Sequence, residues 1–185
     1  MRITLASTSP RRRELIKKLG LQVDFVSPEC DENIDCIAPA ACAETLAERK
    51  AMSVNVGGVI IGADTVVAVD GSLLGKPKSR EDALDMLKKL SGRAHEVVTG
   101  LCVISGEKKL ISSITTTVTF GSYDAAAAEA YADSGKCFDK AGGYGIQDEE
   151  IKRMITCVDG DIDNVIGLPI ALLRKMIDEV TKEIR

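Results

Sequence analysis

Histidine is almost absent from this sequence, which holds His95 alone among its 185 residues. No Cys-x-x-Cys pair occurs either, so the sequence offers neither a zinc ribbon nor a Cys₂His₂ zinc site. A single histidine placed before a strand is more often structural than part of a Cys–His catalytic pair. Because no export signal is present, we expect the thiols to be reduced and partly buried. The six cysteines are Cys30, Cys36, Cys42, Cys102, Cys137 and Cys157.

Long apolar runs are also missing. No basic segment followed by an apolar one is present, and no run is long enough to cross a bilayer, so we expect a cytoplasmic protein with no membrane partner. Neither sign of charge is in large excess, because 24 Lys and Arg against 28 Asp and Glu give a formal net charge of −4. This balance argues against a general nucleic-acid coat, and we expect no nucleic-acid partner.

The order of the predicted elements favours an α/β fold. With 45% hydrophobic residues and no low-complexity tract, the chain can bury a core as a single domain over residues 1–185, or as two lobes that share a cleft. Two long strands that look antiparallel suggest a sheet rather than a pure βαβ repeat. Strands are predicted at 3–6, 21–26, 59–67, 97–104 and 110–120, and helices at 10–19, 38–53, 80–90, 125–133 and from 170 onward.

The beginning of the chain has the features of an anion site. A short apolar strand at 3–6 runs into Ser7-Thr8-Ser9, and then into a helix that begins at Pro10 with Ser9 as its N-cap. Residues 11–13 are all arginine, although the first turn of a helix normally favours acidic side chains. Backbone N–H groups, hydroxyls and guanidinium groups at such a turn can bind phosphate, even though neither GxxxxGK[ST] nor GxGxxG is present. A solvated basic turn is the alternative interpretation.

Asp64 interrupts a strand that should reject charge. Residues 59–67 form a β-branched run between glycines, which is typical of a strand buried on both faces. An ionised carboxylate there needs a metal, a cation or hydrogen-bond donors. The sequence therefore marks Asp64 as a candidate catalytic base, with a strand-end residue that caps a neighbouring turn as the alternative.

Two further segments have the composition of ligand-binding loops. Lys76 lies between Gly75 and Pro77 after an Asp-Gly hairpin turn, which is a plausible way to direct an ammonium inward. In residues 138–147, three glycines within four positions let the backbone approach a ligand closely. The same segment supplies Asp139, Lys140, Tyr144 and Gln147 as side chains for that ligand.

Several short motifs, taken together and in order, resemble those of the Maf family of nucleoside triphosphate pyrophosphatases. The resemblance covers nearly the whole chain. It implies an α/β, two-lobed mixed-sheet fold of the inosine triphosphatase-like kind with a central nucleotide-binding cleft, and a homodimer. It also implies metal-dependent cleavage between the α- and β-phosphates of a nucleoside triphosphate. The motifs lie at residues 5–12, 62–65, 75–77, 90–92, 139–147 and 165–169.

The resemblance also implies roles for individual residues. Asp64 corresponds to the general base that activates water, and Glu32 to an acidic residue that serves metal binding and catalysis. A divalent cation, Mg²⁺ or Mn²⁺, is expected between Glu32, Asp64 and the phosphates, because oxygen ligands suit a hard cation. From the residues alone, Lys50 reads as an ordinary helix-surface lysine. The resemblance places it among four phosphate-binding residues, Ser7, Arg12, Lys50 and Lys76, of which Lys76 also counts as catalytic.

Substrate preference can be predicted from three positions. Arg11, Thr65 and Gln147 match the subgroup that resembles dTTP/UTP pyrophosphatases, whereas the 7-methyl-GTP subgroup has other residues there. The amide of Gln147 can donate to O4 of uracil or thymine and accept from N3–H, whereas a carboxylate offers acceptors only. The expected activity is housecleaning hydrolysis of dTTP, UTP and modified pyrimidine nucleotides. The alternatives are a pyrophosphatase for 7-methyl-GTP or another nucleotide, and a non-catalytic nucleotide-binding regulator of cell division.

Overall fold

The computed structural model of the chain describes residues 2–34 and 38–182. Its centre is a seven-stranded mixed sheet with the order β2-β1-β3-β5-β6-β7, and β4 pairs with part of β3. β1 runs parallel to β2 and β3, and the remaining pairs are antiparallel. The strands are β1 (Ile3–Ala6), β2 (Asp24–Val26), β3 (Val59–Val69), β4 (Ser72–Leu74), β5 (Ala94–Ser105), β6 (Lys108–Phe120) and β7 (Ile155–Asp159).

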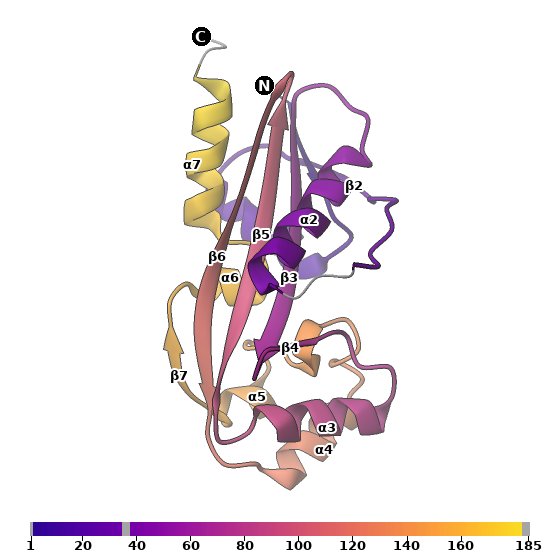
Figure 1. The fold of residues 1–185 in the computed structure, drawn as a ribbon, viewed down its shortest axis with the longest axis vertical. Helices are drawn as coiled ribbons and strands as arrows, with labels where there is room; N and C mark the ends of the chain where they lie inside the picture. The colour runs from indigo at the N-terminus through magenta and orange to yellow at the C-terminus, as the bar shows by residue number, and fades with distance from the viewer. Residues whose placement is uncertain (1, 35–37, 183–185) are drawn as a thin grey trace.

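The longer helices divide between the two halves of the molecule. β5 and β6 run its length; α2 and α7 lie alongside the sheet in the half that holds both termini, and α3, α4 and α5 lie at the other end (Figure 1). The α/β fold with a mixed sheet is therefore confirmed. The helices are α1 (Pro10–Leu15), η1 (Ile16–Leu19), α2 (Pro39–Met52), α3 (Arg80–Leu90), α4 (Ala125–Asp133), η2 (Ala141–Gly143), α5 (Glu149–Lys152), α6 (Ile162–Ile166) and α7 (Ile170–Thr181).

Local sequence signals account for many element boundaries. α1 begins at Pro10 as predicted, and Oγ of Ser9 accepts a hydrogen bond from the backbone N–H of Arg12. The hairpin between β3 and β4 turns at Asp70 and Gly71, whose φ angles of 49° and 72° are those that such two-residue turns require. β2 is shorter than the predicted strand at 21–26, because only its last three residues pair with β1.

The sheet has a gap along one edge of β3, and this gap positions the cleft. β5 covers one edge of β3, while β1 pairs with residues 59–62 and β4 with residues 67–69 on the other. Within the described chain, residues 63–66 therefore have no strand neighbour on that side. Side chains of adjacent strand residues point to opposite faces, so Asp64 and Thr65 approach the gap from the two faces of the sheet.

Glycines let α2 lie directly on the sheet beside this gap. A Cβ atom added to Gly62 of β3 would overlap the carbonyl oxygen of Ala47, and one added to Gly100 of β5 would overlap the backbone of Ala43. Only glycine permits so close an approach between strand and helix. Because Ala47 is one turn before Lys50 on α2, this contact brings Lys50 down to the level of Asp64.

The cysteine prediction is wrong at one described position. Cys42, which is buried on α2, is disulfide-bonded, whereas Cys30, Cys102, Cys137 and Cys157 are free thiols as expected. Cys36 lies outside the described residues. In the part of the chain that the structure describes, no helix is both long and apolar enough to cross a membrane.

Candidate active site

One cleft of about 720 Å³ opens at the gap along β3. Its walls come from the end of β1, the start of α1, α2, β3, the segment after β4, and the segments 139–148 and 165–167. The fold thus brings together side chains that lie far apart in the sequence. Every residue predicted for the site lies on these walls, namely Ser7, Arg11, Arg12, Glu32, Lys50, Asp64, Thr65, Lys76 and Gln147.

Lys50 lies between the two predicted catalytic carboxylates. Its Nζ is 2.6 Å from Oδ1 of Asp64 and 3.1 Å from Oε1 of Glu32. Lys50 is only 6% exposed and Asp64 8%, so the interpretation of Lys50 as a surface lysine from the residues alone is wrong. Partial burial opposes ionisation of Glu32, but the neighbouring Lys50 ammonium outweighs it, and the pKa of Glu32 lies below its ordinary value. This part of the cleft therefore combines two carboxylates with one buried cation.

Arg12 reaches the cleft from the other face of β3. Its Nε donates to the carbonyl oxygen of Gly167 at 2.8 Å, and its Nη2 donates to Oγ1 of Thr65 at 3.0 Å. Burial lowers the pKa of Arg12 and the nearby Asp64 charge opposes that change, but a guanidinium remains charged at neutral pH. Ser7 is a buried residue of the cleft wall, and its Oγ accepts from the N–H of Ser9 at 3.1 Å.

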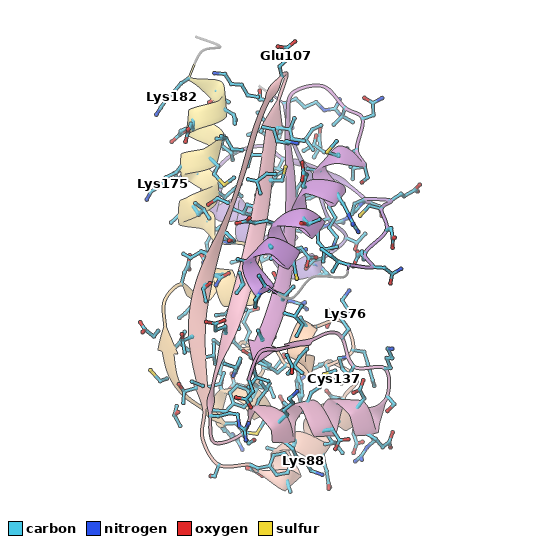
Figure 2. The ribbon with its side chains drawn as sticks, in the orientation of Figure 1. Lys76, Lys88, Glu107, Cys137, Lys175 and Lys182 are labelled. Atoms are coloured by element: carbon cyan, nitrogen blue, oxygen red, sulfur yellow. The ribbon has the colours of Figure 1, made fainter. Side chains whose placement is uncertain are left out.

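The remaining predicted residues line the outer part of the cleft. Arg11 is held by Asp139, with 2.6 Å between Nη1 and Oδ2, and Gln147 is exposed on the wall. Lys76 is also exposed and lies between the end of the molecule that carries α2 and the end that carries α3 (Figure 2). These side chains are placed to meet a ligand that extends outward from Lys50 and Arg12.

The side chains of the cleft can hold a divalent cation only if a bound substrate supplies further oxygen ligands. No group of three or more His, Cys, Asp or Glu side chains among the described residues could hold a metal by itself. Glu32 and Asp64 do converge on one cationic atom, Nζ of Lys50. Mg²⁺ is commonly bound by one or two carboxylates together with substrate phosphates and water. Two convergent carboxylates therefore fit such a metal.

Sequence reasoning missed three residues that support Arg12. Gly167 supplies the carbonyl described above, while Thr99 on β5 and Asn164 on α6 lie behind Thr65 and are fully buried. The sequence offers one sign of Thr99, namely that it is a polar residue within the apolar run of β5. Nothing in the local sequence connects it to Thr65, which is 34 positions away.

Comparison with known sequences relates the whole chain to one family. A family model described as Maf-like protein matches residues 2–180. A dTTP/UTP pyrophosphatase of Thermosipho africanus is 42% identical, with 100% of this chain and 99% of that protein covered. A protein of the same name from Carboxydothermus hydrogenoformans is 43% identical over 97% of this chain and 98% of the relative. One from Symbiobacterium thermophilum is 40% identical over 96% and 93%.

A solved structure shares the fold. The structure of a HAM1 protein from Coxiella burnetii aligns over 98% of this chain and 99% of that chain, with a TM-score of 0.53. Sequence identity is 14%, so the likeness concerns the fold alone. It agrees with the mixed sheet and with the fold class predicted from the sequence.

Proposed function

Because the chain belongs to the family of Maf-like proteins, we propose that it is a nucleoside triphosphate pyrophosphatase that hydrolyses dTTP and UTP. The products are the nucleoside monophosphate and pyrophosphate. The three relatives described above are each named dTTP/UTP pyrophosphatase, and each aligns with this chain over nearly its full length. Modified pyrimidine nucleotides belong to the same proposed substrate class.

One arrangement in the cleft supports this proposal most directly. Lys50 is held between Asp64 and Glu32, and Arg12 approaches from the opposite face of the sheet. Fixed cations can balance the charge of a triphosphate, and a carboxylate nearby can accept a proton from water. A cleft that only bound nucleotides would have no need for the carboxylates beside the cations.

Each residue has a proposed part in the reaction. Oδ1 of Asp64 is held by Lys50, which leaves Oδ2 to take the proton of the attacking water. Lys50 fixes the orientation of that carboxylate and keeps a positive charge next to the phosphates. Arg12, Ser7 and Lys76 bind phosphate oxygens. Of the described residues, none accepts from Nη1 of Arg12, so this nitrogen is available to an oxyanion.

We also propose a divalent cation, Mg²⁺ or Mn²⁺, held by Glu32 and Asp64 together with substrate phosphates. When bound, it would neutralise charge on the phosphates and on the departing pyrophosphate. The two carboxylates are the acidic groups that converge at this point of the cleft. Lys50 would remain beside them as a second source of positive charge.

Base preference is assigned to Gln147 with Arg11. The amide of Gln147, exposed on the cleft wall, can both donate and accept, which matches O4 and N3–H of uracil or thymine. Mispairing one such contact costs about 1–3 kcal/mol, which is enough for a clear preference. Asp139 holds Arg11 at the same wall, so that its guanidinium has a fixed position.

The oligomeric state and the cellular location are also proposed from membership of the Maf-like family. We expect a homodimer, which light scattering of the purified protein would measure. We expect the enzyme to act in the cytoplasm, where nucleoside triphosphates are made and used. Fluorescence microscopy of a tagged chain would test this.

A substrate panel tests the proposed activity. Purified protein is incubated with dTTP, UTP, CTP, dGTP, GTP, 7-methyl-GTP and ATP in the presence of Mg²⁺ or Mn²⁺, and pyrophosphate is followed. We expect the fastest release from dTTP and UTP. Release from purine nucleotides alone would contradict the role of Gln147. No release from any nucleotide would leave a non-catalytic binding role.

A further inference from the structure

A row of polar groups behind the cleft connects Arg12 to α6. Nη2 of Arg12 lies 3.0 Å from Oγ1 of Thr65, and this oxygen lies 2.9 Å from Oγ1 of Thr99. Oγ1 of Thr99 lies 2.9 Å from the carbonyl oxygen of Asn164. Thr65 and Thr99 are directly paired across β3 and β5, so their side chains share one face of the sheet.

The chemistry of these groups fixes the direction of every hydrogen bond. A guanidinium can only donate and a carbonyl can only accept, whereas each threonine hydroxyl has a single proton. Thr99 must therefore donate to the carbonyl of Asn164, which obliges Thr65 to donate to Thr99. Thr65 in turn accepts from Arg12. Its hydroxyl proton is committed, so any ligand group that meets Thr65 must itself be a donor.

α6 and the residue that follows it supply the two carbonyl groups that hold Arg12, one directly and one through the two threonines. The carbonyl of Gly167, directly after α6, accepts from Nε of Arg12 at 2.8 Å, and the carbonyl of Asn164 within α6 holds Arg12 through the two hydroxyls. The side-chain amide of Asn164 anchors the helix to the sheet, donating to Val97 O at 2.9 Å and to Thr116 Oγ1 at 2.8 Å. One edge of the guanidinium, Nε and Nη2, is thus held by a single turn of chain.

We propose that Thr99 is a positioning residue for Arg12, and that it acts through Thr65. The inference rests on the proposed function, because it assumes that the guanidinium of Arg12 binds the triphosphate. Thr99 is fully buried and does not line the cleft, so it does not touch substrate. If the hydroxyl of Thr99 is removed, the hydroxyl of Thr65 loses the group that accepts its proton and can rotate. Nη2 of Arg12 then loses its fixed hydrogen-bond acceptor.

The segment 164–169 has the backbone conformation that this support of Arg12 requires. Gly167 has a φ of 120°, and a Cβ atom there would lie 3.3 Å from Oγ1 of Thr65 and 3.5 Å from Nε of Arg12. A side chain at this position would be strained and would crowd both groups. Glycine lets the carbonyl meet the guanidinium, while Asn164 fixes the helix that carries this carbonyl.

The test compares Thr99→Val with Thr99→Ser. Valine keeps the shape of threonine and removes the hydroxyl, whereas serine keeps the hydroxyl and removes a methyl group. We expect Thr99→Val to lower kcat/KM for dTTP by roughly tenfold, because a misplaced binding group weakens transition-state contacts. Thr99→Ser should stay within about twofold of the wild type. Equal kcat/KM for Thr99→Val and the wild type would overturn the proposal.

A double-variant cycle separates positioning from general damage to the fold. If Thr99 acts through Arg12, adding Thr99→Val to Arg12→Ala should change kcat/KM by less than about twofold. A full tenfold loss in that background would show that Thr99 acts by another route and would overturn the inference. Thermal unfolding of each variant records stability independently.

Thr4→Val is the matched control. Thr4 on β1 is also a fully buried threonine, but its hydroxyl has no hydrogen-bond partner among the described residues. Removing it should leave kcat/KM unchanged and the Tm unchanged or higher. A loss of activity in Thr4→Val equal to that in Thr99→Val would mean that any buried Thr→Val exchange is harmful, and would contradict a specific role for Thr99.

Binding of a non-hydrolysable analogue distinguishes this inference from the proposed function. α,β-imido-dUTP is titrated into the wild type, Thr99→Val and Thr99→Ser. A wild type that binds the analogue but releases no pyrophosphate from dTTP would contradict the proposed activity only. Weaker binding by Thr99→Val, restored in Thr99→Ser, would then still support the inference, and equal binding would overturn it. A wild type that neither binds nor hydrolyses would contradict both.

Discussion

The ammonium of Lys50 and the carboxylate of Asp64 form a buried ion pair, with 2.6 Å between Nζ and Oδ1. This pair keeps one oxygen of Asp64 in place and so determines which oxygen is left for a proton. Asp64→Asn retains the shape and can still accept from Lys50 through its amide oxygen, but it cannot act as a base. We expect turnover of dTTP to fall by on the order of 10²–10⁴-fold.

Affinity for nucleotide, measured without divalent cations, should change little in Asp64→Asn, because the side chains assigned to phosphate binding, Ser7, Arg12, Lys50 and Lys76, are untouched. Single-turnover kinetics and analogue titration measure the two quantities separately. Near-normal turnover would remove Asp64 from the role of base. Glu32→Gln is a useful companion, since it removes the other carboxylate at Lys50 and leaves Asp64 intact.

Lys50→Met should be among the more destabilising substitutions in the cleft. It leaves Asp64 buried without its cation and next to Glu32, and breaking a buried pair costs about 3–5 kcal/mol. Because Glu32 is about half exposed, we expect a loss near the lower limit, about 3 kcal/mol, in the free energy of unfolding measured with urea. Adding Asp64→Asn should recover part of this loss. A double variant less stable than Lys50→Met would argue against the ion pair as the cause.

Acid should destabilise the protein through His95. Burial lowers the pKa of His95 to about 4, and its Nε2 lies 2.7 Å from the hydroxyl of Tyr144. The unfolded chain takes up the proton near pH 6.5, so stability is lost as the pH falls from there toward the folded pKa. The loss attributable to His95 is about 2 kcal/mol between about pH 7.5 and about pH 5.

His95→Gln tests this assignment. Glutamine can keep a hydrogen bond to the Tyr144 hydroxyl but does not titrate. Urea unfolding across the same pH interval should show a shallower decline in the variant than in the wild type. Parallel curves for the two proteins would place the acid sensitivity elsewhere.

Removal of divalent cations should abolish pyrophosphate release. EDTA is expected to stop the reaction, and added Mg²⁺ or Mn²⁺ to restore it, because two carboxylates and the phosphates suffice to hold a hard cation. Glu32→Gln should raise the metal concentration needed for half-maximal rate. Full activity in EDTA, with metal content verified by mass spectrometry, would exclude a metal requirement.

Gly62→Ala should disturb the site from outside the cleft. The added methyl group would overlap the carbonyl of Ala47 and push α2 away from β3. Overpacking of this kind typically costs about 1–3 kcal/mol, and moving Lys50 should lower kcat as well. Gly57→Ala is the matched control, because a Cβ atom there meets nothing within 4 Å. Similar Tm and kcat values in both variants would contradict the close contact.

Local chemistry made part of this structure predictable. The start of α1 follows from Ser9 and Pro10, and the turn between β3 and β4 from Asp70 and Gly71, since caps and tight turns depend on neighbouring residues only. The buried charge at Asp64 was also visible, because an acidic residue stands out within a β-branched run.

The partners of these residues were not predictable from local sequence. α2 buries three alanines, Cys42 and one large apolar side chain, Leu46, so no stripe of large apolar residues marks the face on which Lys50 lies. Its burial depends on Gly62 and Gly100, which belong to other elements. The support of Arg12 likewise spans residues 12, 65, 99 and 164, and only the complete sheet register brings them together.

The glycine contact under α2 divides the cleft into a fixed side and an adjustable side. Lys50 and Asp64 belong to a helix and a strand whose backbones touch, so neither can move without the other. Glu32 and Gln147 lie outside regular helices and strands, and we expect adjustment to a bound nucleotide to occur there. Over evolutionary time, the base contact made by Gln147 can therefore change through replacement of its loop, while Lys50 and Asp64 stay in place.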